Sequence, residues 1–122
     1  MEGKIKSFTD LKAWQEAHRL VLEIYEATCK FPKDEIFGLT NQMRRCSVLI
    51  SSNIAEGFSR PTSKDKSKFY FISLGSTTEL QNQLLISKDV KFLAQKDFNN
   101  LAQQTIAVHK LINGLIKYLK NT

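Results

Sequence analysis

The chain of 122 residues contains only two cysteines, two prolines and five glycines, and it has no long run of apolar residues. Without a run of about 18 apolar residues no helix spans a membrane, and the opening MEGKIKSFTDLK lacks the apolar stretch of a secretory signal. We therefore expect a cytoplasmic protein in which Cys29 and Cys46 stay reduced. Two cysteines without matching His or Cys spacing make no zinc site, so the sequence predicts neither a metal nor a cofactor.

The composition is that of one folded domain over residues 1–122. Hydrophobic residues make up 42% of the chain and charged residues 25%, which is typical of a folded protein and not of a disordered one. The scarcity of proline, of glycine, and of valine beside leucine and isoleucine favours helices over strands.

The net charge of +6 is unevenly distributed along the sequence. Residues 43–122 carry twelve Lys or Arg against five Asp or Glu. This excess is compatible with an anionic partner, and nucleic acid is the first candidate. The alternative is that the lysines only keep helix surfaces solvated.

Apolar residues recur at spacings of three and four in four segments, which predicts helices over about 9–30, 39–57, 64–90 and 95–120. The pair Phe31-Pro32 ends the first segment, and the stretch SRPTSKD separates the second from the third. Gly57 is interpreted as the C-terminal cap of the second helix, with a positive φ. Four helices with short connections predict an all-α, antiparallel, up-down-up-down four-helix bundle.

The apolar positions also predict which helix faces lie in the core. In the first helix the expected core stripe is Leu11, Trp14, His18, Val21, Tyr25 and Thr28. In the third helix one arc is expected in the core, consisting of Phe69, Ile72, Leu80, Leu84, Ile86 and Val90. A second arc, made of Phe71, Leu74 and Leu85, points nearly the opposite way. In so small a bundle this arc predicts an interface with another copy of the chain.

Several polar residues fall inside or beside these apolar arcs. We interpret them as structural polar contacts within the bundle: Gln42, Asn53, Glu56, Ser76 and Glu79. Asn53 is expected to form hydrogen bonds across the bundle, and Glu79 to pair with Arg44 or Arg45.

A chemical site is the alternative interpretation, because Glu56, Glu79 and His18 resemble the ligands of a di-metal bundle. Such sites use Glu-x-x-His, and the residues three positions after the two glutamates are Ser59 and Asn82. The sequence therefore predicts no catalytic residue and no enzyme.

A set of short motifs through residues 7–90 carries a family resemblance. The set comprises Phe8, Leu11, Trp14, Ile24-Tyr25, Phe31-Pro32, Glu35, Gly38-Leu39, Gln42, Arg44-Arg45, the run NIAEG at 53–57, Arg60, Gly75-Ser76 and Glu79-Leu80. With these motifs the chain resembles the four-helix-bundle family named after the 23S ribosomal RNA intervening sequence.

The resemblance implies a bacterial four-helix bundle, and several members of the family are homopentamers with a central channel. A related accessory protein of diversity-generating retroelements presents a basic surface to nucleic acid and binds a reverse transcriptase. Other members are encoded within insertions in ribosomal RNA genes, and their role is undefined.

We therefore expect a non-enzymatic homo-oligomer that binds RNA or DNA through clustered basic residues. The expected contacts are Arg44, Arg45, Arg60, Lys64, Lys66 and Lys68. The alternative is a scaffold that recruits a protein partner, such as a reverse transcriptase, without binding nucleic acid itself.

Overall fold

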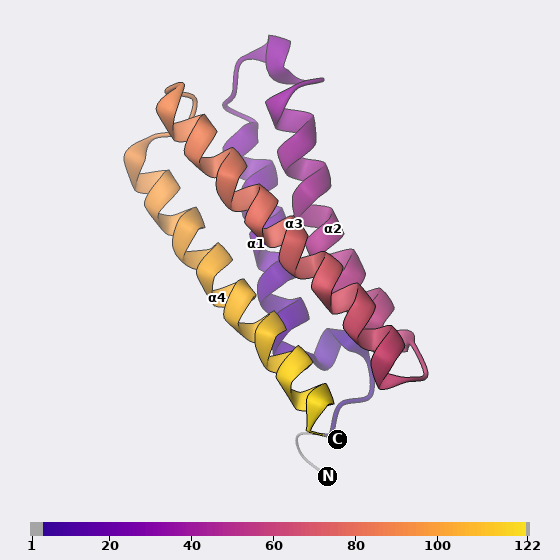
Figure 1. Cartoon of the computed structure of the whole chain (residues 1–122). Helices are drawn as coiled ribbons and strands as arrows, with labels where there is room; N and C mark the ends of the chain where they lie inside the picture. Colours follow the sequence, from indigo (N-terminus) through magenta and orange to yellow (C-terminus); the bar gives the residue numbers. More distant parts are fainter. Residues whose placement is uncertain (1–3, 122) are drawn as a thin grey trace.

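The computed structural model describes residues 4–121, which form four long helices and two single turns of 3-10 helix (Figure 1). The long helices are α1 (Lys12–Thr28), α2 (Leu39–Ser59), α3 (Ser63–Asp89) and α4 (Gln95–Lys120). The short turns are η1 (Phe8–Asp10) and η2 (Lys33–Glu35). No strand occurs within residues 4–121, so the all-α class predicted from the sequence is confirmed. Nor is any helix in this range long and apolar enough to cross a bilayer.

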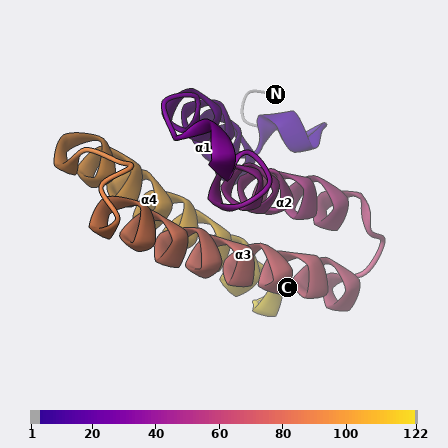
Figure 2. The same ribbon diagram turned by 90° about the horizontal axis from the view of Figure 1, so that it is seen from above.

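Successive helices run antiparallel and each packs against two others (Figures 1 and 2). The guanidinium of Arg44, near the start of α2, donates to the hydroxyl of Thr28 at the end of α1. The ammonium of Lys88, at the end of α3, lies 4.7 Å from the ring centre of Phe98 at the start of α4. This order brings both ends of the described chain and the α2–α3 connection to one end of the bundle.

The first helical turn is fixed by a capping box, in which two side chains satisfy backbone N–H groups that have no helical partner. The Ser7 hydroxyl accepts from the N–H of Thr9, and Asp10 Oδ2 accepts from the N–H groups of Lys6 and Ser7 at 3.0 and 3.1 Å. These two backbone donors lower the pKa of the Asp10 carboxyl. The N-terminal segment is thereby held where α1 begins.

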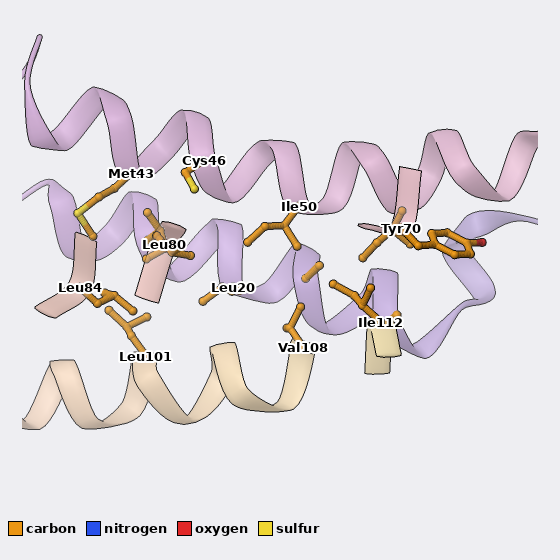
Figure 3. Packing of buried hydrophobic residues seen from close by; sticks show 14 of the residues in the cluster. Leu20, Met43, Cys46, Ile50, Tyr70, Leu80, Leu84, Leu101, Val108 and Ile112 are labelled. Atoms are coloured by element: carbon orange, nitrogen blue, oxygen red, sulfur yellow. The ribbon is translucent and has the colours of Figure 1, made fainter. Parts of the chain in front are cut away.

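The core is a column of aliphatic side chains drawn from all four helices (Figure 3). Leu20 of α1, Met43 and Ile50 of α2, Leu80 of α3 and Ile112 of α4 have no solvent-accessible surface. Burying a side chain of this size stabilises the fold by about 1.5–3 kcal/mol relative to leaving it exposed. In the fourth helix the spacing of three and four predicts a core row of Phe98, Leu101, Thr105, Val108, Ile112, Leu115 and Leu119. Its central members, from Leu101 to Ile112, are buried, and the other three are half-buried against the core.

The core stripe predicted for the first helix is confirmed at Leu11 and Thr28, which are buried, and wrong at His18 and Tyr25. The buried row of α1 is Ala13, Ala17, Leu20, Ile24 and Thr28. His18 and Tyr25 are exposed. Trp14 is half-buried and stacks on His18, with the two ring centres 4.7 Å apart. Small alanines let α1 approach its neighbours closely, so the larger residues of the predicted stripe are left at the edge of the interface.

The arc predicted to bury α3 is also wrong in part. Leu80 and Leu84 are buried, but Ile72, Ile86 and Val90 are 51%, 43% and 49% exposed. The buried residues of α3 are instead Tyr70, Ser73, Ser76, Thr77, Leu80, Gln83, Leu84 and Ser87. Three of their hydroxyl groups are tolerated there because each is hydrogen-bonded: Ser73 donates to the Ile50 carbonyl of α2, Thr77 to the Ser73 carbonyl, and Ser87 to the Gln83 carbonyl.

Gly57 does not cap α2, which continues to Ser59 and is followed by Arg60. Its role is to allow a close approach between α2 and α3. A Cβ atom at this position would lie 2.7 Å from Cε1 of the Tyr70 ring and 3.1 Å from Cβ of Phe69. Only glycine fits this crossing without displacing a buried aromatic ring.

Candidate nucleic-acid interface

Positive charge is concentrated at one end of the bundle. We call this the basic end: residues 4–19, 50–76 and 108–121, which hold the chain ends and the α2–α3 connection (Figure 1). It carries eleven Lys or Arg against four Asp or Glu, a net charge of +7. The remaining described residues, 20–49 and 77–107, include seven Lys or Arg and seven Asp or Glu, so their net charge is zero. Of the net +7 carried by residues 43–122, +5 lies at the basic end, where residues 4–19 add a further +2, whereas Arg44 and Arg45 lie at the other pole.

Three of the predicted contacts in the α2–α3 connection are engaged within the chain. Arg60 pairs with Glu56 at 2.8 Å and lies 4.7 Å from the Phe69 ring centre. The ammonium of Lys66 donates to the Phe58 carbonyl at 2.6 Å, which closes the end of α2. Lys68 lies 4.0 Å from Asp65. These contacts hold the connection in shape, and the surface pairs among them contribute little energy because water screens them.

Lys64 differs from these neighbours because it extends from the first turn of α3 into solvent. Thr62 caps that turn, since its hydroxyl accepts from the N–H of Asp65 at 3.1 Å. Among the predicted contacts in this connection, Lys64 is thus the one best placed to meet an external phosphate.

Arg44 and Arg45 do not join this group, because they lie near the opposite end of α2. Sixteen residues of helix separate Arg44 from Arg60, which corresponds to about 24 Å. Arg44 faces α1, where it donates to the Thr28 hydroxyl at 2.8 Å and lies over the Tyr25 ring. Arg45 is exposed beside a groove lined by Tyr25 and Leu49. The six predicted contacts therefore form two separate groups.

The structure adds lysines that the sequence analysis did not single out. Lys4 and Lys6 precede η1, and Lys117 and Lys120 lie in the last turns of α4; all four are exposed at the basic end. Cations in the last turn of α4 also interact favourably with the helix dipole. The topology of a bundle with an even number of helices could have indicated this grouping, since it brings both chain ends to the α2–α3 connection.

The opposite end of the bundle has a groove of different character. About 310 Å³ in volume, it lies between α1 and α4 and is lined by the carboxylates of Glu23, Glu26 and Asp97, together with Lys30. The amide of Gln104 in α4 donates to Oε1 of Glu23 in α1 at 2.6 Å. A phosphate backbone would be repelled here, so the two poles of the molecule differ in the partners they favour.

The predicted polar contacts of α2 and α3 take a different form from the one expected. The amide of Asn53 donates to the Leu49 carbonyl of its own helix at 2.8 Å, not across the bundle. Glu79 is exposed and accepts from the Gln83 amide at 3.3 Å, in place of the expected pair with Arg44 or Arg45. Asn53 is half-buried on α2 and satisfies its amide within its own helix, whereas Glu79 lies on the solvent-facing side of α3.

The other three predicted polar residues, Gln42, Glu56 and Ser76, lie near the border between the core and the solvent. Gln42 and Glu56 are exposed on α2, and Glu56 is the partner of Arg60. Ser76 is 7% exposed, and its backbone carbonyl accepts from the Cys46 thiol at 3.0 Å. At Ser76 the contact between α2 and α3 is thus made by the thiol of Cys46, a residue for which no structural role was predicted.

The thiols and the other metal-binding side chains are dispersed. Burial raises the pKa of Cys46 to about 12, and the charge of Glu79 adds to the increase. Cys29 is exposed, with Arg44 Nη2 3.6 Å from its sulfur. Within the described part of the chain no three His, Cys, Asp or Glu side chains are grouped to hold a metal ion.

Comparison with known proteins places the chain in a family. Residues 9–114 match the family model described as 23S rRNA-intervening sequence protein. No curated protein matches the chain. A crystal structure of a protein of unknown function from the S23 ribosomal protein family of Bacteroides thetaiotaomicron has a similar fold, with a TM-score of 0.79 and 16% sequence identity. The similarity covers 86% of this chain and 95% of that protein. Because the family model spans most of the sequence, this chain belongs to the 23S rRNA-intervening sequence protein family.

Proposed function

We propose that this protein is a non-enzymatic, cytoplasmic homo-oligomer that binds RNA or DNA through the basic end of its bundle. The observation that carries the proposal is the uneven distribution of charge within residues 4–121. The basic end has a net charge of +7, and the opposite pole has a net charge of zero. Lysines on several separate segments suit contact with phosphates, which are spaced regularly along a strand and present the same charge whatever the base.

Binding of this kind has a characteristic dependence on salt. Each phosphate that a lysine or arginine neutralises releases a counterion, so the logarithm of the affinity falls with the logarithm of the salt concentration. We expect a dissociation constant of about 10⁻⁴ to 10⁻⁶ M at physiological salt and little preference among sequences. A strong preference for one base sequence at unchanged salt dependence would contradict this mode of binding.

The experiment compares two matched triple variants in a fluorescence anisotropy titration with RNA and with DNA. Lys64→Gln, Lys117→Gln and Lys120→Gln together remove three exposed charges from the basic end. The control variant removes three exposed lysines near the opposite pole, Lys30→Gln, Lys33→Gln and Lys91→Gln. Both variants have the same net charge, so they differ only in where the charge was removed.

We expect the basic-end variant to lose affinity and to shift the salt slope by about 2–3 toward zero, because each lost phosphate contact removes about 0.9 from the slope. The control variant should bind nearly as tightly as the unchanged protein. Equal losses in the two variants would show that only net charge matters. Absence of binding at low salt would reject nucleic acid as the partner.

A protein-recruiting scaffold is the second candidate function, and a specific observation favours it. Phe37 is 90% exposed and Ile36 is 48% exposed in the α1–α2 connection, at the pole opposite the basic end. Exposed aromatic side chains of this kind are typical anchors of protein interfaces. A protein partner that stays bound after nuclease treatment, and that Phe37→Ser releases, would support the scaffold.

A further inference from the structure

Three aromatic side chains lie against one another beside the start of α1. Phe8 of η1 meets the ring of Trp14 edge to face, with the two ring centres 5.3 Å apart. Trp14 in turn stacks on His18, one helical turn further on, with ring centres 4.7 Å apart and ring planes inclined by only 14°. We call these three rings the aromatic cluster. It lies within residues 4–19, one of the three segments of the basic end.

The outer ring of the aromatic cluster is open to solvent. Phe8 and Trp14 are half-buried and pack against the edge of the core, whereas His18 is exposed. The buried row of α1 passes through Ala13 and Ala17 instead. Burial therefore does not account for the position of the His18 ring, which extends a flat aromatic surface outward from Trp14. A ring held in this way is a surface on which an unpaired base can stack.

The charges around the aromatic cluster favour a polyanion. Residues 4–19 carry four Lys or Arg against two Asp or Glu. Both acidic side chains are engaged within the chain, because Asp10 accepts from two backbone N–H groups and Glu16 lies 3.5 and 3.9 Å from two basic side chains. Lys4 and Lys6 are exposed in the segment that leads into the cluster. A phosphate backbone that passes the cluster therefore meets cations.

A further aromatic ring lies among lysines at the same end of the bundle. Tyr118, in the last turns of α4, is 67% exposed, and Lys117 and Lys120 flank it in the sequence. The end of α4 and the start of α1 lie at the same pole (Figure 1). Aromatic rings interspersed with lysines are typical of proteins that bind single strands, because the lysines follow the backbone while the rings stack on bases.

We infer that the basic end binds single-stranded nucleic acid, with an unpaired base stacked on His18 at the outer side of the aromatic cluster. This inference rests on the nucleic-acid binding proposed above and specifies the form of the ligand. The bases of a duplex are already paired and stacked on each other, whereas those of a single strand can turn outward to a ring on a protein. Every base has an aromatic face, so stacking agrees with the weak sequence preference expected above.

The aromatic cluster does not overlap the interface predicted from the sequence for self-association. Of that arc, Phe71 and Leu85 are 52% and 46% exposed on α3, and Leu74 is half-buried against the core. Because α1 packs against α2 and α4, α3 lies diagonally across the bundle from it (Figure 2). A contact between copies through this arc therefore leaves the aromatic cluster free to bind.

A fluorescence anisotropy titration with three labelled ligands of equal length tests the inference. The ligands are a single-stranded RNA of mixed sequence, a strand of abasic nucleotides with the same number of phosphates, and a duplex RNA; a second set is made of DNA. We expect the single strand to bind about tenfold more tightly than the abasic strand, because only the former has bases to stack. Charge alone would favour the duplex, whose phosphates are more closely spaced, so we expect the single strand to bind more tightly than the duplex as well.

Variants of the two histidines assign the effect to the aromatic cluster. His18→Ala should weaken binding of the single strand about five- to tenfold and leave that of the abasic strand unchanged. His18→Phe keeps a ring at this position and should restore the affinity. His109→Ala is the matched control, because this second histidine of the basic end shares a hydrogen bond of 3.2 Å with the amide of Asn113 and lies outside the cluster. Circular dichroism and light scattering show whether each variant folds and associates like the unchanged protein.

Tryptophan fluorescence gives a readout that needs no variant. Trp14 is the only tryptophan of the chain, so its emission reports directly on the aromatic cluster. A base stacked on the cluster should quench this emission when the single strand is added, whereas the abasic strand should leave it unchanged.

The outcomes separate this inference from the proposal on which it rests. Tighter binding of the single strand than of the abasic strand, with the difference lost in His18→Ala, supports both. Equal, salt-dependent binding of the two strands would overturn the stacking and leave the phosphate contacts intact. Absence of binding to every ligand would overturn both.

Discussion

The glycine at position 57 gives the most direct test of how α2 and α3 pack. In Gly57→Ala the new methyl group would lie 2.7 and 2.9 Å from Cε1 and Cδ1 of the Tyr70 ring. These distances are below van der Waals contact, and Tyr70 is only 3% exposed, so the ring has no free space into which to move. The helices must therefore separate or the ring must leave its preferred rotamer.

Two effects of opposite sign decide the magnitude. Replacing glycine with alanine in a helix stabilises it by about 1 kcal/mol. Inserting a methyl group into a filled interior costs about 1–3 kcal/mol. Because the obstacle is a rigid, buried ring and not the end of a flexible chain, we expect the upper part of that range. The net loss in the free energy of unfolding is then about 1–2 kcal/mol.

Gly114→Ala is the matched control, since a Cβ atom there would have no neighbour within 4 Å. This change should raise the free energy of unfolding by up to about 1 kcal/mol, the helix effect alone. Urea unfolding followed by circular dichroism measures both variants, at one protein concentration because self-association affects apparent stability. If Gly57→Ala is as stable as Gly114→Ala, the close approach of α2 to Tyr70 is not what the glycine serves.

Three further predictions concern single groups. Ellman's reagent should modify Cys29 rapidly in the folded protein and Cys46 only on unfolding. Burial raises the pKa of Cys46 to about 12 and keeps its thiol protonated and unreactive. Two rapidly reacting thiols per chain would contradict the burial of Cys46. Ser73→Ala should lower the free energy of unfolding by about 0.5–1.5 kcal/mol, since it removes the hydroxyl of α3 that donates to the Ile50 carbonyl of α2. An unchanged free energy in urea unfolding would show that this contact contributes nothing. The pKa of Asp10 is lowered in the folded protein, so its carboxylate stabilises the fold fully above the ordinary pKa near 3.9. This stabilisation is lost as the pH falls through the lowered pKa of the folded state. In Asp10→Asn the melting temperature should therefore decline less steeply in acid than in the unchanged protein.

The sequence was sufficient to predict the four helices because their boundaries depend on local signals. Phe31-Pro32 and the SRPTSKD stretch interrupt the periodic segments, and the observed helix ends fall within about three residues of those predicted. The fourth helix was also assigned its correct face, because its core row from Leu101 to Ile112 is apolar except at Thr105. Where hydrophobic periodicity is clear, it determines both the element and its orientation.

The faces of α1 and α3 could not be predicted in the same way, because size and hydrogen bonding decided them. Ala13 and Ala17 are buried in α1 since close packing favours small residues over Trp14. In α3, Ser73 and Thr77 are buried because their hydroxyls bond to backbone carbonyls, a possibility that hydrophobicity does not register. The basic end was missed for a different reason, since it is assembled from three segments that only the topology brings together.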